Sequence, residues 1–281
     1  MELLKADIKK SCEIVLWSDT HDGDVHQASD KVHEMIEWIG AKNNRYFVHL
    51  GDAIEAIRTD DKRYQSDTTT QPIPVLQALD VVRQFRPIRK HCLAWLKGNH
   101  EDALSRSGDL VRDIICRELE MPYGSYTCKL RLENNGNPLF KAFLWHGPRS
   151  AAMNSNAKDY VQRQANMLAL LKRRLEQKAG DCLVMCIAHT HKLLILPPSS
   201  RLVLSDDGDK IRQSYIGQGC GLDEFIELDR RWYVNTGCAI RLYVTGVDGY
   251  AERAGYDPME IGCAIAEIDG GKLVNIRKEV W

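Results

Sequence analysis

Five short polar signatures in the chain carry aspartate, histidine and asparagine at spacings that suit metal binding. They are Asp19-Thr20-His21, Gly51-Asp52-Ala53-Ile54-Glu55, Gly98-Asn99-His100-Glu101, His146-Gly147 and His189-Thr190-His191. Imidazole nitrogens, carboxylates and an amide oxygen are the donors that borderline divalent metals prefer. A lone Asp-x-His is more often a surface loop than a ligand pair, so the prediction depends on all five signatures occurring in order.

Seven side chains in these signatures are candidate ligands, enough for two ions when one carboxylate bridges the pair. Alternate residues of extended backbone point to the same side, so Asp-x-His and His-x-His can each present two convergent ligands. Glycine precedes two of the ligands and lets the backbone approach the ions, which a Cβ would hinder. The ligands are Asp19, His21, Asp52, Asn99, His146, His189 and His191, and the glycines are Gly51 and Gly98.

Each signature follows a segment whose pattern predicts a buried strand. Apolar residues at helical spacing follow the first two strands near 25–39 and 75–89, and further helices are predicted at 109–119 and 158–177. Two strand-helix units in succession predict a largely parallel sheet, which binds ligands at the carboxyl ends of its strands. The predicted strands are 14–17, 46–50, 92–96, 140–145 and 182–188.

Beyond His191 the chain becomes rich in short predicted strands separated by Gly and Asp turns. This pattern indicates hairpins or a second sheet. The chain shows no repeat, low-complexity tract or linker. Residues 1–281 are therefore predicted to form a single domain of the α/β class.

Composition narrows the classes of function. Hydrophobic residues make up 44% and charged residues 27% of the chain, as in a soluble globular protein. The formal net charge is -1, so no global basic field attracts nucleic acid. Nine scattered cysteines without a Cys-x-x-Cys pair indicate no disulfide framework and predict a cytoplasmic location. No apolar stretch approaches the roughly 18 residues that span a bilayer, so no membrane association is expected.

The ordered signatures resemble the calcineurin-like metallophosphoesterase superfamily. Its pattern is Asp-x-His, Gly-Asp-x-x-Asp/Glu, Gly-Asn-His-Asp/Glu, His and Gly-His-x-His. The match spans Asp19 to His191, with Ala188 where glycine is usual. Segments 234–237 and 249–253 are similar to uncharacterised phage and bacterial members. The resemblance implies a two-sheet sandwich flanked by helices, with a strand-rich C-terminal part, that hydrolyses phosphoesters.

The resemblance also implies roles for individual residues. One ion is held by Asp19, His21, Asp52 and His191, and the other by Asp52, Asn99, His146 and His189, so that Asp52 bridges them. Mn²⁺ is the expected ion, with Fe, Zn, Ni or Co as alternatives. A hydroxide between the ions attacks phosphorus in line, and His100 protonates the leaving oxygen. Glu55 and Glu101 orient His100 or a ligating imidazole.

The shared metal core does not select the phosphoester. Protein phosphatases carry Gly-Asp-x-Val-Asp-Arg-Gly, whereas residues 51–57 of this chain read Gly-Asp-Ala-Ile-Glu-Ala-Ile, which disfavours that branch. We expect a phosphodiesterase for small or flexible phosphodiesters. Its specificity rim would be the polar insert Arg58 to Gln71 and the loop Pro148 to Asn156. Arg149 is the candidate substrate-binding residue.

Two alternatives stay open. A DNA-processing nuclease of the same superfamily would rely on the local cations Lys172, Arg173 and Arg174. The simpler interpretation of those cations is the solvated basic end of a helix. A catalytically inactive binding scaffold would keep the fold, but it is disfavoured because every ligand position is filled.

Overall fold

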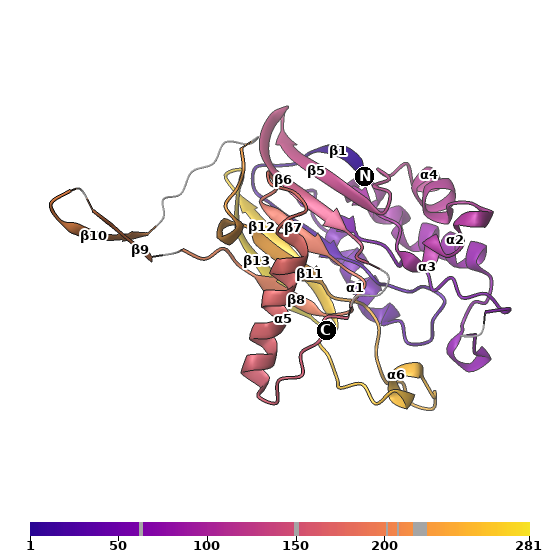
Figure 1. Cartoon of the computed structure of the whole chain (residues 1–281). Coiled ribbons are helices and arrows are strands. Elements are labelled where there is room, and N and C mark those ends of the chain that lie inside the picture. Colours follow the sequence, from indigo (N-terminus) through magenta and orange to yellow (C-terminus); the bar gives the residue numbers. More distant parts are fainter. Residues whose placement is uncertain (62–63, 149–151, 201, 207, 216–223) are drawn as a thin grey trace.

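The computed structural model describes residues 1–61, 64–148, 152–200, 202–206, 208–215 and 224–281. They form two packed β-sheets with helices on the outer faces (Figure 1). A two-stranded hairpin of β9 (Leu202–Asp206) and β10 (Ile211–Tyr215) projects from this body. The α/β two-sheet sandwich expected from the sequence is confirmed.

The first sheet has five strands in the order β13-β12-β2-β3-β4. Strands β2, β3 and β4 run parallel to one another, as the two strand-helix units predict. Strands β12 and β13 run antiparallel to their neighbours. The strands are β2 (Cys12–Trp17), β3 (Arg45–His49), β4 (Cys92–Trp95), β12 (Gly262–Asp269) and β13 (Lys272–Val280).

The second sheet has six strands in the order β1-β5-β6-β7-β11-β8. Here β6, β7 and β11 run parallel, so their carboxyl ends lie at one edge. The strands are β1 (Glu2–Asp7), β5 (Thr127–Asn134), β6 (Asn137–Trp145), β7 (Val184–Ile187), β8 (Leu193–Leu196) and β11 (Trp232–Thr236).

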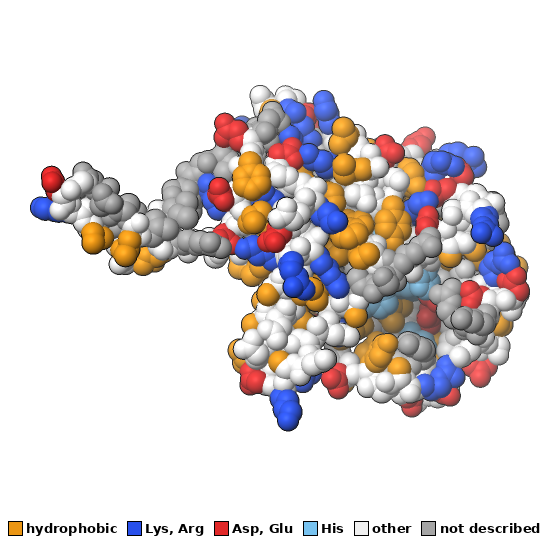
Figure 2. Space-filling view, in the orientation of Figure 1, with side chains coloured by type: hydrophobic (Ala, Val, Ile, Leu, Met, Phe, Trp, Pro, Cys, Tyr) orange, Lys and Arg blue, Asp and Glu red, His pale blue; other side chains and the backbone are white. Residues whose placement is uncertain are grey.

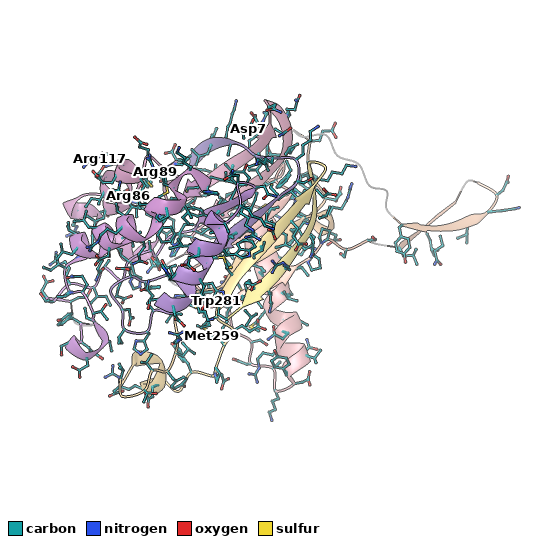
Figure 3. The ribbon with its side chains drawn as sticks, turned by 180° about the vertical axis from the view of Figure 1, so that it is seen from behind. Asp7, Arg86, Arg89, Arg117, Met259 and Trp281 are labelled. Atoms are coloured by element: carbon teal, nitrogen blue, oxygen red, sulfur yellow. The ribbon has the colours of Figure 1, made fainter. Side chains whose placement is uncertain are left out.

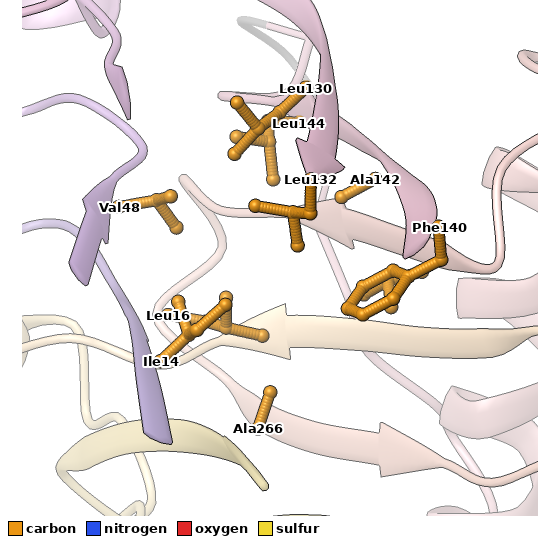
Figure 4. Close-up of a pocket in the computed structure, with 10 residues that line it drawn as sticks. Ile14, Leu16, Val48, Leu130, Leu132, Phe140, Ala142, Leu144 and Ala266 are labelled. Atoms are coloured by element: carbon orange, nitrogen blue, oxygen red, sulfur yellow. The ribbon is translucent and has the colours of Figure 1, made fainter. Parts of the chain in front are cut away.

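Strand β2 contributes side chains both to the core between the two sheets and to the core beneath the helices. Ile14 and Leu16 pack against the second sheet, whereas Val15 and Trp17 pack against the helices, because alternate side chains point to opposite faces. A cavity of about 20 Å³ lies between the sheets and is lined by aliphatic side chains and Phe140 (Figure 4). A space this small holds no substrate. This cavity is therefore not the active site.

Helices cover both outer faces. Helix α1 (Ser29–Gly40) buries Val32, Met35, Ile36 and Ile39, the spacing that predicts it from the sequence. Helix α2 (Pro74–Phe85) begins with proline, whose missing N–H costs nothing in the first turn. On the other face, α5 (Tyr160–Leu175) begins after Asp159, whose side chain accepts a 2.8 Å hydrogen bond from Gln162 N.

The predicted helix at 109–119 differs from the structure. Val111–Cys116 wind as a π-type turn, and only Arg117–Leu119 (α4) are α-helical. Val111, Ile115 and Leu119 are nonetheless all buried. The wider π-type winding therefore places the same apolar side chains in the core as the predicted regular helix would. The remaining short helices are α3 (Asn99–Asp102) and α6 (Tyr250–Arg253), with 3₁₀ turns at Ser66–Thr68, Arg86–His91, Ser105–Ser107 and Leu228–Arg230.

Most of the described strands beyond His191 join the two large sheets, and β9 and β10 form a separate two-stranded hairpin. Strands β8 and β11 complete the six-stranded sheet, and the hairpin β12–β13 completes the five-stranded one. The sequence pattern does not indicate β1, because its side chains alternate only between exposed and half-buried. Figure 3 shows the molecule from behind, with Asp7 at the end of β1 and the C-terminal Trp281 directly after β13. No helix in the described ranges is long and apolar enough to cross a membrane.

Candidate metal centre

The carboxyl ends of five strands bring all seven predicted ligands to one edge of the sandwich. Six of the seven, together with His100, have donor atoms in three overlapping groups, each with all its atoms within 4.8 Å of one another. The seventh, Asn99, has its Oδ1 2.9 Å from His146 Nε2. Histidine side chains are visible in a hollow of the surface (Figure 2). The ligands are Asp19 and His21 after β2, Asp52 after β3, Asn99 after β4, His146 after β6, and His189 and His191 after β7.

The first group centres on Asp19. Its Oδ1 lies 3.3 Å from His191 Nε2 and 3.9 Å from His21 Nε2. Asp19 Oδ1 and His21 Nε2 are buried and have no hydrogen-bond partner in the described part of the chain. Each such orphaned atom costs about 1–3 kcal/mol. A cation between them would satisfy both, so these residues fit a metal ion.

The second centre of contacts is Asp52, which belongs to two of the three donor groups. Its Oδ2 lies 3.2 Å from His146 Nε2 and 4.0 Å from His21 Nε2. The same His146 nitrogen lies 2.9 Å from Asn99 Oδ1. His189 joins Asp52 and His146 in the third donor group. Asp52 therefore lies between the two sets of candidate ligands.

Hydrogen bonds on the far side of the imidazoles fix their orientation. His21 Nδ1 donates to Glu55 Oε2 at 2.7 Å, and His146 Nδ1 donates to the Leu50 carbonyl at 2.7 Å. Both rings therefore carry a proton on Nδ1 and turn Nε2 toward the carboxylates. This is the arrangement that metal-binding histidines usually show.

Glu101 acts on the backbone and not on an imidazole. Its carboxylate accepts hydrogen bonds from the N–H groups of Gly98 at 2.7 Å, Asp52 at 3.1 Å and Ala53 at 2.6 Å. These contacts tie the loop after β3 to the loop after β4. Burial, followed by the nearby Asp52 charge, raises the pKa of Glu101 to about 7. The role expected for Glu101 from the sequence thus differs from the contacts that it makes.

His100 lies beside the candidate ligands. Its Nδ1 donates to the Glu55 carbonyl at 2.5 Å, and its backbone N–H donates to Asp52 Oδ1 at 2.9 Å. The rings of His100 and His21 meet edge to face with centroids 4.7 Å apart. His100 also belongs to one of the donor groups, together with His21 and Asp52. It is thus close enough to the centre to act on a bound ester.

The backbone of the ligand loops corrects one expectation. The dyads are not extended, because five ligands adopt the left-handed region, with φ from 47° to 69°. Non-glycine residues are uncommon there, and such strain concentrates at functional sites. The five residues are Asp19, His21, Asp52, His189 and His191.

Gly51 and Gly98 allow two of these loops to touch. Gly51 has φ +98°, and a Cβ there would lie 2.4 Å from Gly98 N. A Cβ on Gly98 would lie 2.0 Å from Asp52 Oδ1. A side chain at Gly51 would therefore displace the backbone at Gly98, and one at Gly98 would displace the Asp52 carboxylate.

Electrostatics in the metal-free centre favour the protonated forms of two histidines, His21 and His146. Burial acts to lower the pKa of His21, but the hydrogen bond and charge of Glu55 raise it to about 10. Burial likewise opposes the charged form of His146, and the Asp52 charge raises its pKa to about 9. The protons thus balance buried carboxylates in the place that a metal ion would take.

His49 contacts two of the ligand loops, the one after β2 and the one after β3. It is fully buried and stacks on Trp95 with centroids 4.3 Å apart. Its Nε2 lies 3.2 Å from Thr20 Oγ1, and its Nδ1 accepts from Gly51 N at 3.2 Å. Burial lowers the pKa of His49 to about 3, so the ring is neutral. The strand pattern alone shows burial but not this support, which depends on loops from two strands.

The predicted rim is partly placed. The insert Arg58 to Gln71 is described except for 62–63. It is joined to the segment after His21 by a hydrogen bond of 2.9 Å, in which Val25 N donates to the Thr68 carbonyl. A polar recess of about 520 Å³ opens between this insert and the C-terminal part, lined by Tyr64, Gln65, Ser66, Asp67, Asp248 and Arg253. Arg149 lies outside the described residues, as do Ser150 and Ala151 of the second loop.

The cations of α5 make local contacts. Lys172 forms an ion pair with Asp229. Arg174 donates to the Ala152 carbonyl at 2.6 Å, and Arg173 is exposed. Two of the three cations therefore bind neighbouring parts of the protein itself.

Comparison with known proteins agrees with this geometry. The sequence model of the calcineurin-like phosphoesterase family matches residues 14–193, which include every predicted ligand. No curated protein matches the chain. Solved structures give weaker likenesses. Vps29 complexed with Zn²⁺ from Entamoeba histolytica is 13% identical, with 96% of this chain and 98% of that chain covered and a TM-score of 0.39.

Two other solved structures resemble the chain at similar levels. A predicted phosphoesterase from Streptococcus pneumoniae TIGR4 is 13% identical, with 97% and 99% of the two chains covered and a TM-score of 0.33. The NAD nucleotidase of Haemophilus influenzae is 11% identical, with 96% of this chain and 50% of that chain covered and a TM-score of 0.40. On the family match, this chain belongs to the calcineurin-like phosphoesterase family and is a metal-dependent phosphoester hydrolase.

Proposed function

We propose that the protein is a phosphodiesterase with a dinuclear metal centre bridged by Asp52. The observation that carries the proposal is the place of Asp52 in two donor groups, one with His21 and one with His146. Mn²⁺ suits this mixture of oxygen and nitrogen donors, with Fe, Zn, Ni and Co as alternatives. One ion would take Asp19, His21, Asp52 and His191, and the other would take Asp52, Asn99, His146 and His189.

Ions bound there would supply an activated water at neutral pH and offset charge on the phosphate oxygens. The protein's own contribution begins with Glu55, which fixes His21 through its carboxylate. The Glu55 carbonyl holds the Nδ1 proton of His100, so Nε2 is the ring nitrogen left to pass a proton to the leaving oxygen. Asp52 Oδ1 fixes the backbone of His100. His100 is therefore the proposed general acid.

We propose small or flexible phosphodiesters as substrates. The net charge of -1 gives no general attraction for a polyanion. The recess at the insert carries two acidic residues, Asp67 and Asp248, against the single Arg253, a poor lining for a DNA backbone. Lys172 and Arg174, on which nuclease activity would rely, are engaged in local contacts. Hydrolysis of small phosphodiesters is therefore favoured over nuclease activity.

The organisation of the chain supports a single domain. Strand β12 pairs with β2, and β11 pairs with β7, so residues far apart in sequence share both sheets. We also propose a reducing, cytoplasmic location. Its support is that the eight cysteines in the described ranges are free and buried.

A comparison of substrates tests the proposed function. Hydrolysis of an aryl phosphodiester, an aryl phosphomonoester, and single- and double-stranded DNA would be measured with Mn²⁺ across a salt series. We expect the aryl diester to be the best substrate, with little dependence on salt. Fast DNA cleavage that falls steeply with salt, and that Lys172→Ala, Arg173→Ala and Arg174→Ala together abolish, would favour the nuclease instead.

A further inference from the structure

Strand β11 lies outside the residues matched by the family model, yet two of its side chains reach the ligand loops. Thr236 and Asn235 are both 0% exposed. Successive side chains of a strand point to opposite faces, so the two residues reach different loops. Thr236 approaches the loop after β2, and Asn235 approaches the loop after β7.

Thr236 begins a chain of hydrogen bonds that ends on Asp19. Its Oγ1 lies 2.7 Å from Ser18 Oγ, and the Ser18 hydroxyl donates to Asp19 Oδ2. Each hydroxyl has one proton, so Thr236 donates to Ser18 while Ser18 donates to Asp19. His189 N donates to the same carboxylate oxygen at 3.2 Å. With Oδ2 engaged in this way, the carboxylate is held with Oδ1 toward His21 and His191.

Asn235 supports the loop that carries two more ligands. Its Nδ2 donates to Thr190 Oγ1 at 2.5 Å, and Thr190 stands between His189 and His191. Both histidines have positive φ, so the loop is strained and needs external support. The Oδ1 of Asn235 is buried with no hydrogen-bond partner in the described ranges. The unsatisfied Oδ1 lowers the stability of the fold, so the Asn235 side chain is better explained by its hydrogen bond to Thr190 than by packing.

We propose that Thr236 and Asn235 are positioning residues of the metal centre. Thr236 holds Asp19 through Ser18, and Asn235 holds His189 and His191 through Thr190. The inference rests on the proposed dinuclear centre, and it adds a strand beyond the family match to the residues that tune that centre. Contacts of this kind behind the ligands typically change metal affinity by about 10–100-fold.

Calorimetric titration of Mn²⁺ into metal-free protein tests this without any substrate. Thr236→Val keeps the side-chain volume and removes the hydroxyl, so we expect Mn²⁺ affinity to fall about tenfold or more. Thr236→Ser retains the hydroxyl and should restore most of that affinity. Thr190→Val removes the acceptor for Asn235 at a half-buried position, which avoids the folding risk of changing Asn235 itself, and should also weaken Mn²⁺ binding.

Tyr233→Phe is the matched control on the same strand. The Tyr233 hydroxyl donates to the Leu228 carbonyl at 2.8 Å, away from the centre, so its loss should lower Tm without changing Mn²⁺ affinity. Wild-type affinity in both Thr236→Val and Thr190→Val would overturn the positioning role. So would a loss in Thr236→Ser equal to that in Thr236→Val, or an equal loss in Tyr233→Phe. A wild-type protein that takes up none of the candidate ions, Mn²⁺, Fe, Zn, Ni or Co, would overturn the proposed function, and this inference with it.

Discussion

The backbone carbonyl of Glu55 accepts a 2.5 Å hydrogen bond from His100 Nδ1. The carboxylate of the same Glu55 accepts a 2.7 Å hydrogen bond from His21 Nδ1. A single residue thus orients a candidate metal ligand through its side chain and the candidate general acid through its backbone. The two functions can therefore be separated by mutation, because a side-chain change leaves the carbonyl in place.

Glu55→Gln should weaken metal binding more than it weakens the proton transfer. The glutamine can still accept from His21 Nδ1 but lacks the charge, so Mn²⁺ affinity should fall about tenfold while kcat at saturating Mn²⁺ changes less. Calorimetry and steady-state kinetics measure the two effects. Glu34→Gln, at an exposed position on α1, is the control and should change neither. A fall in kcat at saturating Mn²⁺ with normal affinity would contradict this assignment.

His100→Ala should lower kcat by roughly 10²–10⁴-fold while leaving metal content near normal, because His100 is assigned to proton donation. The loss should shrink for aryl diesters with very acidic leaving groups, which need no proton. A series of aryl substrates and metal analysis of the purified variant measure both effects. An equal loss for every leaving group would contradict the role, and a loss of metal would make His100 a ligand instead.

Metal affinity and metal-free stability should depend on pH in opposite directions. The raised pKa values of His21, about 10, and His146, about 9, mean that the folded protein binds these protons more tightly than the unfolded chain. Their stabilisation is complete below about pH 6.5 and is lost as pH rises through the folded pKa values. Tm of metal-free protein should therefore fall from about pH 6.5 to about pH 10.

Mn²⁺ affinity should rise over the same interval, because the ion displaces the two protons. Thermal melts with and without Mn²⁺ at several pH values would show the two curves diverging. A Mn²⁺-induced increase in Tm that stays constant with pH would show that His21 and His146 are not displaced by the ion.

Arg231→Met should destabilise the fold without affecting the centre. The fully buried guanidinium donates to the carbonyls of Ala179 at 2.8 Å, Glu176 at 3.1 Å and Gly180 at 3.1 Å, joining the end of α5 to β11. Hydrogen bonds to charged groups contribute about 1.5–3 kcal/mol each, so we expect a loss of about 3 kcal/mol or more in the free energy of unfolding. Urea unfolding measures it. The exposed Arg173→Met is the control, and equal stability of the two variants would contradict the prediction.

The sequence predicts which residues converge but not how the backbone presents them. Each signature follows an apolar strand, as Asp19 follows Trp17, so the common edge of the ligands can be inferred locally. Asp52 has a left-handed φ beside the close contact between Gly51 and Gly98, which lie in loops that follow different strands. No local pattern contains that contact.

The same limit applies to the C-terminal strands. Their existence is visible in the sequence, but the parallel pairing of Val234 with Cys186 joins β11 to β7 across a long separation. Only this register brings Thr236 to Ser18. Burial of Val111 and Ile115 is likewise predictable, whereas the π-type winding between them is not.

Metal content and its removal test the central claim most directly. Purified protein loaded with Mn²⁺ should hold two ions per chain, since Asp52 belongs to two donor groups, and chelation should abolish hydrolysis of an aryl phosphodiester until Mn²⁺ returns. Asp52→Asn should impair both ions together, whereas a change at His191 should impair mainly one. Full turnover by metal-free protein, or a single ion that Asp52→Asn leaves in place, would contradict the account.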